Sequence, residues 1–166
     1  MTPAGMHLAE LNVGRLLAPT DDPRVAEFMA ALDRVNGLGK RMPGFVWMME
    51  GSGEPGTGNT EAKIEGDPQF VTNLTVWESV ETLEHFVWNT VHRAFYERRA
   101  EWFEVLGRMH FVMWWVPAGH RPTLDEALER LAHLQANGDS DRAFGWSYLK
   151  EARLWRDHGC ARHAAE

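Results

Sequence analysis

Four short segments of the chain have the pattern of β-strands. Residues 7–17, 45–50, 69–77 and 110–116 are rich in apolar, aromatic and β-branched side chains, and Gly, Pro or Asp occur between them. The third segment alternates most regularly, so Asn73 and Trp77 are expected on one face of its strand. The Gly-rich residues 51–68 predict a long loop before this strand, with a short strand near residues 63–64.

Three other segments have the spacing of amphipathic helices, and each begins with a capping residue. Asp22, followed by Pro23, predicts a helix that ends near Gly37 and Gly39. Ser79 predicts the start of a long helix over residues 80–104. Thr123 predicts a third helix over residues 124–137.

The order of these elements predicts an α+β fold of the ferredoxin-like type, β-α-β-β-α-β with a C-terminal helix. Residues 1–138 are expected to form this domain, and residues 139–166 to be an extension packed on it. In this topology the first and third strands are the central pair. Helices then cover only one face of the sheet, so a second copy is expected to cover the other and form a dimeric α/β barrel.

The composition narrows the function. The net charge of −7 argues against a nucleic-acid partner, which would need clustered Lys and Arg. The longest apolar run, residues 111–116, is too short to span a membrane, and residues 1–10 lack a signal-peptide pattern. The single cysteine, Cys160, cannot form an internal disulfide. A cytoplasmic homodimer that binds a small molecule is therefore expected.

The predicted long helix carries two sets of residues at seven-residue intervals. The two sets are His85, His92 and Arg99, and Trp88, Phe95 and Trp102. They are expected to form adjoining stripes on one flank of the helix, which together make a cationic and aromatic wall. An imidazole in such a wall can act as an acid, a base, an anion anchor or a haem ligand. The other interpretation is a half-exposed helix edge with no chemical role.

Bound metal ions are not expected. Seven residues rise about 10.5 Å along a helix, which is too far for His85 and His92 to share one ion. The sequence has no HExxH motif and no cysteine pair. No cofactor is therefore predicted, although haem needs only one histidine ligand from the chain and stays an alternative.

A second set of polar residues is predicted on the sheet. Asn73 and Trp77 share a face of the third strand, and Asn12 on the first strand is expected beside them. Amide and indole N–H groups can hold a carbonyl or enolate oxygen. Trp47 and Trp114 are candidates for the wall of the same pocket, and core packing explains these two residues equally well.

Several stretches resemble a bacterial family of uncharacterised proteins within the dimeric α/β-barrel superfamily, which includes the antibiotic-biosynthesis monooxygenases. They are AELNVGRL (9–16), PGFVWMM (43–49), FVTNLTVWESVETLEHFV (70–87), HRAFYERRAEWF (92–103) and WWVPAGHRPTLDEALERL (114–131). The resemblance implies a ferredoxin-like dimer. In the superfamily's cofactor-free monooxygenases, an Asn and a Trp four residues apart on the third strand bind a phenolic substrate, a spacing that Asn73 and Trp77 match.

These observations lead to three functional hypotheses. The first is an enzyme acting on aromatic or polyketide-like substrates, in which Asn73 and Trp77 bind oxygens and His85 or His92 moves protons. Asn12, Trp47, Trp88, Arg99 and Trp114 would contact its substrate. The second is a haem-binding protein with His85 or His92 as ligand. The third is a non-catalytic dimer that binds a hydrophobic ligand.

Overall fold

The computed structural model describes residues 1–52, 54 and 56–158. Cys160 lies outside the described residues. Four strands form one antiparallel sheet: β1 (Met6–Arg15), β2 (Phe45–Met48), β3 (Phe70–Trp77) and β4 (Phe111–Pro117). Their order is β2-β3-β1-β4, so β1 and β3 are the central pair, as the predicted topology requires.

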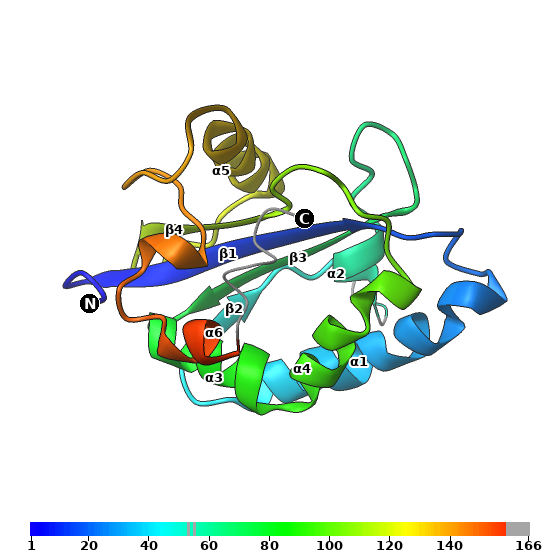
Figure 1. Cartoon of the computed structure of the whole chain (residues 1–166), viewed down its shortest axis with the longest axis horizontal. Helices are drawn as coiled ribbons and strands as arrows, with labels where there is room; N and C mark the ends of the chain where they lie inside the picture. Colours follow the sequence, from blue (N-terminus) through cyan, green and yellow to red (C-terminus); the bar gives the residue numbers. More distant parts are fainter. Residues whose placement is uncertain (53, 55, 159–166) are drawn as a thin grey trace.

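Helices lie on both faces of this sheet (Figure 1). They are α1 (Ala26–Arg41), α2 (Thr57–Thr60), α3 (Val80–Asn89), α4 (Val91–Glu97), α5 (Leu124–Asn137) and α6 (Arg153–Asp157), with 3₁₀ helices η1 (Pro23–Val25), η2 (Arg99–Glu101) and η3 (Trp146–Tyr148). Helices α1, α3 and α4 lie below the sheet in this view, and α5 lies above it. Within the described residues, no helix has the length and apolar character needed to cross a membrane.

The face that α5 covers, here called the α5 face, was predicted to be covered by a second copy and not by a helix of the same chain. It carries Ala9, Leu11 and Trp114, all fully buried, and α5 packs Ala127 and Leu131 against them. The expectation that helices cover one face only is therefore wrong. The apolar stripe of residues 124–137 predicts that this helix buries a surface, but the stripe does not say against which face.

The opposite face, here called the α3 face, carries Leu8, Glu10 and Asn12 on β1 and their register partners Trp77, Thr75 and Asn73 on β3. Its apolar end packs against α3 through Val80 and Leu83. Its polar end faces α1 and α4. Alternation along β3 assigns Trp77, Thr75 and Asn73 to this one face. Along it, the apolar Trp77 end is packed, and the polar Asn73 end lines the cavity.

The predicted helix over residues 80–104 is broken at Thr90. This residue is extended (φ −126°, ψ −175°), and its hydroxyl donates to the Phe86 carbonyl at 2.6 Å. The same oxygen accepts from the backbone N–H of His92, at 3.2 Å, and caps α4. Threonine satisfies both helix ends at once, which the apolar periodicity alone does not reveal.

The other predicted elements differ in smaller ways. Asp22 caps the first helical turn as expected, but α1 continues past Gly39 to Arg41. Gly39 lies against the Phe86 ring, and a β-carbon there would be 3.2 Å from its tip, so glycine serves packing and not helix termination. The loop over residues 51–68 contains the short helix α2, which the sequence did not predict.

The described part of the extension packs on the domain. Phe144 exchanges backbone hydrogen bonds with Met113 on β4, at 2.7 and 2.9 Å. Trp155 is buried against α3, and its backbone N–H donates to the carboxylate of Glu84 at 3.0 Å. Burial is the first cause of the raised pKa of Glu84. This segment closes one end of the space between the sheet and the helices.

Gly44 allows a matched test of how β2 and α3 meet. Its φ is +80°, and a β-carbon would lie 2.3 Å from Cγ2 of Thr82, whereas Gly66 has φ +76° and open space. We expect Gly44→Ala to lower the free energy of unfolding by about 2–4 kcal/mol and Gly66→Ala by about 1 kcal/mol, because only the first adds a clash to the backbone strain. Urea denaturation measures both, and equal losses would contradict this packing.

Candidate functional site

Two adjoining cavities lie between the α3 face of the sheet and helices α1, α3 and α4. The larger, here called the main chamber, has a volume of about 380 Å³, and the smaller, here called the small chamber, about 120 Å³. Six residues line both: Asn12, Asn73, Phe86, His92, Tyr96 and His110. A main chamber of this size is within the range of small-molecule sites.

Asn12 and Asn73 are directly opposite each other on the central strands. The predicted topology makes β1 and β3 neighbours but does not fix this register. The amide of Asn73 donates to Asn36 at 3.4 Å, Asn36 donates to Asn59 at 2.7 Å, and Asn59 donates to the Thr72 carbonyl at 2.9 Å. No side-chain hydrogen bond joins Asn12 to another described residue. The Asn12 amide is therefore available to a ligand.

Asn36 on α1 and Asn59 on α2 were not predicted as site residues. Asn36 lies within an amphipathic helix, where a polar residue is ordinary, and Asn59 lies in a loop sequence that gave no sign of a helix. The sequence holds no signal for Asn59, because its burial, at 6% exposed, exists only in the folded chain. Once buried, its amide needs partners.

His92 enters the cavity from the first turn of α4. Its Nδ1 lies 3.4 Å from the backbone carbonyl of Val87, which can only accept, so the proton of the neutral ring belongs on Nδ1. Burial lowers the pKa of His92 to about 4. At neutral pH its Nε2 therefore keeps a lone pair, as a proton acceptor requires.

His85 lies elsewhere. It is exposed on α3, and its ring contacts the Asn89 amide at 3.2 Å. The seven-residue spacing placed it beside His92 only for a continuous helix, and the break at Thr90 removes that relation. The structure therefore does not bring His85 into the site.

Arg99 supplies a cation to the main chamber. Its guanidinium donates to the Tyr96 carbonyl at 3.0 Å and lies 4.3 Å from the Tyr96 ring centre. Among the described residues, no carboxylate forms an ion pair with Arg99. Burial, and then the Arg99 charge, lower the pKa of His110 in the same wall. An anionic group of a ligand would therefore be favoured here.

Aromatic and aliphatic side chains form the rest of the main chamber. Phe28 and Phe103 meet edge to face with ring centres 4.8 Å apart, and Phe95 and Trp102 lie 5.7 Å apart. Such a wall suits the faces of a planar ring. Trp88, the other aromatic residue predicted here, lines the small chamber instead.

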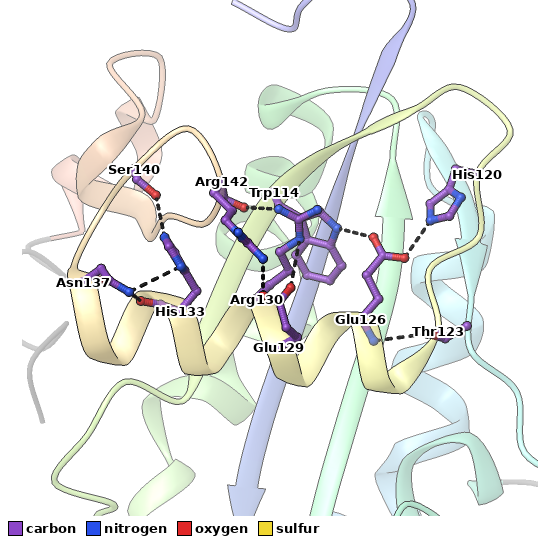
Figure 2. Close-up of polar contacts among 10 residues, drawn as sticks. All are labelled: Trp114, His120, Thr123, Glu126, Glu129, Arg130, His133, Asn137, Ser140 and Arg142. Carbon is purple, nitrogen blue, oxygen red and sulfur yellow. Dashed lines mark hydrogen bonds and ion pairs between the residues drawn. The ribbon is translucent and has the colours of Figure 1, made fainter.

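Three tryptophans predicted for the site lie outside the cavity lining. Trp77 shares the α3 face with Asn73 but is 1% exposed, and its indole N–H donates to the Thr75 hydroxyl at 2.8 Å. Trp47 packs into the core of the α5 face. Trp114 lies there too and donates to Glu126 of α5 at 3.0 Å (Figure 2).

Glu10 is a site residue that the sequence did not single out. It is 6% exposed, lines the small chamber, and accepts a hydrogen bond from the Thr75 hydroxyl at 2.5 Å. Burial raises the pKa of Glu10 to about 8. The available signal is a charged residue within a short strand, two positions before Asn12 and therefore on the same face.

No group of three or more histidine, cysteine, aspartate or glutamate side chains in the described part of the chain could hold a metal ion. The amide and titratable side chains in the lining of the two chambers are four asparagines, His92, His110, Tyr96, Arg99, Glu10 and Glu104.

The fold and cavity define a mixed α+β protein with a cavity of small-molecule size. The chain belongs to the family described as "Domain of unknown function (DUF3291)", which matches residues 7–160. Among solved structures it is similar to the NE2512 protein of unknown function from Nitrosomonas europaea, at 10% identity and a TM-score of 0.42, over 72% of this chain and 95% of that one. No curated protein matches it.

Glu10 makes stability depend on pH. The carboxyl ionises near 4.5 when unfolded and near 8 when folded, so the folded state binds the extra proton between these values and loses stability as the pH rises. The lowered pKa of His92 has the opposite effect, but only between about 4 and 6.5. From pH 6.5 to 8, wild type should lose up to about 2 kcal/mol relative to Glu10→Gln.

Urea denaturation at a series of pH values measures this difference. Parallel stability curves for wild type and Glu10→Gln across pH 6.5–8 would contradict the assignment of a raised pKa to Glu10.

Proposed function

We propose that this chain is a small-molecule enzyme that resembles the cofactor-independent monooxygenases and acts on aromatic or polyketide-like substrates. The observation that carries the proposal is the placement of the Asn12 and Asn73 amides on one wall of the cavity and of neutral His92 on another. One wall can bind an oxygen atom, and the other can accept a proton.

The reaction would begin with removal of an acidic proton from the substrate. His92 accepts this proton at Nε2, and the N–H groups of Asn12 and Asn73 donate to the oxygen on which negative charge develops. The planar ring would lie against Phe95 and Trp102 in the main chamber. Arg99 lowers the energy of the anion and favours substrates that already carry an acidic group.

Oxygenation would follow from the substrate anion itself. The carbanion gives electrons to dioxygen, a C–O bond forms, and the proton held by His92 is returned to give a hydroperoxide. Loss of one water from a methylene hydroperoxide leaves a carbonyl group, so CH₂ and O₂ become C=O and H₂O. The chain's part is to bind, deprotonate and shield the anion.

The proposal includes a more specific fold class than mixed α+β. The order β2-β3-β1-β4 supports a ferredoxin-like domain of the dimeric α/β-barrel superfamily. The covered α5 face removes the original reason for pairing two sheets, but the resemblance still implies a homodimer. Sedimentation would detect it. The described cavity is formed within one chain, so a monomer would leave the proposed chemistry intact.

We expect purified protein to consume oxygen with 1,8-dihydroxyanthrone, an aromatic ketone with an acidic methylene group. His92→Gln should lower the rate above background by about 100-fold or more, because it removes the base. His85→Gln is the matched control and should stay within about two-fold of wild type, because that ring is exposed and outside the cavity. An oxygen electrode measures the rates of oxygen uptake by wild type and by both variants.

Equal rates for His92→Gln and His85→Gln would contradict the role of His92. Binding of the anthrone without oxygen uptake, unchanged in Asn73→Ala, would favour a non-catalytic hydrophobic-ligand protein instead.

One observation favours haem binding as a second candidate function. The Nδ1 of His92 contacts a backbone carbonyl and its Nε2 has a lone pair, which is the usual state of a histidine that would hold haem iron. Arg99 could pair with a propionate group. Bound haem would supply redox chemistry that the side chains lack.

The haem candidate predicts a shifted Soret band when haemin is added to the protein. The shift should be lost in His92→Ala and kept in His85→Ala, as an absorption titration would show. An unchanged haemin spectrum, or equal shifts in both variants, would exclude His92 as the ligand.

A further inference from the structure

We propose that Glu10 is a second proton-transfer group of the cavity and that, as an acid facing the base His92, it makes enolisable carbonyl compounds the substrate class. This inference rests on the proposed function and deepens it. It adds the small chamber as the place where the substrate carbonyl binds, and it adds a reaction, enolisation, that needs no oxidant.

Glu10 is held at the wall of the small chamber by the central strands. It pairs in register with Thr75 on β3 and with Met113 on β4, and it points to the same face as Asn12. The small chamber is therefore lined by one carboxyl group, by the amides of Asn12 and Asn73, and by His92. These are the groups needed to bind a carbonyl oxygen and to move two protons.

The hydrogen bonds around Glu10 fix which of its oxygens carries the proton. The indole N–H of Trp77 can only donate, so the Thr75 hydroxyl accepts it at 2.8 Å and turns its own proton toward Oε1 of Glu10 at 2.5 Å. Oε1 is thereby an acceptor. The acidic proton belongs on Oε2, for which no described residue is a hydrogen-bond partner. Trp77 and Thr75 are positioning residues for this carboxyl group.

No lysine or arginine is among the described residues that line the small chamber, and the titratable side chains that face Glu10 there are His92, His110 and Tyr96. The Thr75 hydrogen bond favours the carboxylate, but burial outweighs it. Burial lowers the pKa of both histidines, so both are neutral at pH 7. The raised pKa of Glu10, about 8, agrees with this surrounding. Acid and base are thus both present at neutral pH in the forms that the reaction needs.

Enolisation balances with these two groups alone. The bond between the α-carbon and its hydrogen breaks, and Nε2 of His92 takes the proton. The electron pair forms the C=C bond of the enol, and the carbonyl oxygen takes the proton of Glu10 Oε2. The reverse path restores both groups. In D₂O the proton on His92 exchanges with solvent, so the return step places deuterium on carbon.

The probe for this inference is 2-tetralone, a bicyclic ketone with an acidic C–H beside its aromatic ring. Loss of its C1 proton signal in D₂O is followed by NMR. We expect wild type to exceed buffer, and Glu10→Gln to be slower by about 10- to 100-fold, because Gln donates a hydrogen bond but transfers no proton. The wild-type rate should fall above about pH 8, and the Glu10→Gln rate should not.

Glu126→Gln is the matched control. Glu126 accepts directly from the indole N–H of Trp114 on the α5 face (Figure 2), and it lines neither chamber. The Glu126→Gln variant should exchange the C1 protons of 2-tetralone at the wild-type rate. Equal rates for wild type and Glu10→Gln, while His92→Gln is slow, would overturn the role of Glu10 and leave the proposed function standing.

No exchange above buffer by wild type would overturn this inference, and oxygen uptake with the anthrone would then decide the proposed function separately. If Glu10→Gln did not fold, the wild-type pH profile would serve, with circular dichroism to confirm folding at each pH. A rate that falls above about pH 8 supports Glu10 as the acid, and a flat profile from pH 7 to 9.5 overturns it.

Discussion

The site depends on two hydrogen bonds of the Thr90 hydroxyl. This hydroxyl donates to the Phe86 carbonyl and accepts from the His92 N–H, so α3 ends and α4 begins at one residue. A helix continuing straight from α3 would carry His92 along the direction of the first helix. With the break, His92 lines both chambers while His85 is exposed, and α4 and the central strands form two walls of the cavity.

The strand pattern predicts much of this arrangement. Alternation along residues 69–77 predicts the face of Asn73, and the order of elements makes β1 and β3 neighbours. The register that puts Asn12 directly opposite Asn73 is known only from the structure. His92 was also proposed, but from a periodicity that required a continuous helix. The residue is in the cavity because of the break, and its supposed neighbour His85 is not.

The residues that sequence reasoning missed depend on contacts between distant segments. Asn59 is buried because α2 packs beside β3, and Glu10 is neutral because α3, α4 and the C-terminal segment exclude water from it. Trp114 was assigned to the pocket wall for the same reason. A strand pattern does not say on which face of the sheet this side chain lies until α5 is known to cover that face. Burial of a polar side chain is a property of the assembled fold.

Each face of the sheet uses a tryptophan and a carboxyl group differently. On the α5 face, Trp114 donates to Glu126, which also contacts His120 at 2.8 Å near the surface (Figure 2). On the α3 face, the Thr75 hydroxyl stands between Trp77 and Glu10, and the second oxygen of Glu10 is left for the cavity. The first arrangement holds a helix against the sheet, and the second leaves a carboxyl oxygen for a ligand.

The most direct test of the account is a ¹⁵N–¹H correlation spectrum recorded while 2-tetralone is added. The account predicts that the side-chain amide signals of Asn12 and Asn73 shift with the backbone signals of α4, while those of α5 stay in place. Shifts confined to α5, or none in the asparagine amides, would contradict a ligand site in this cavity.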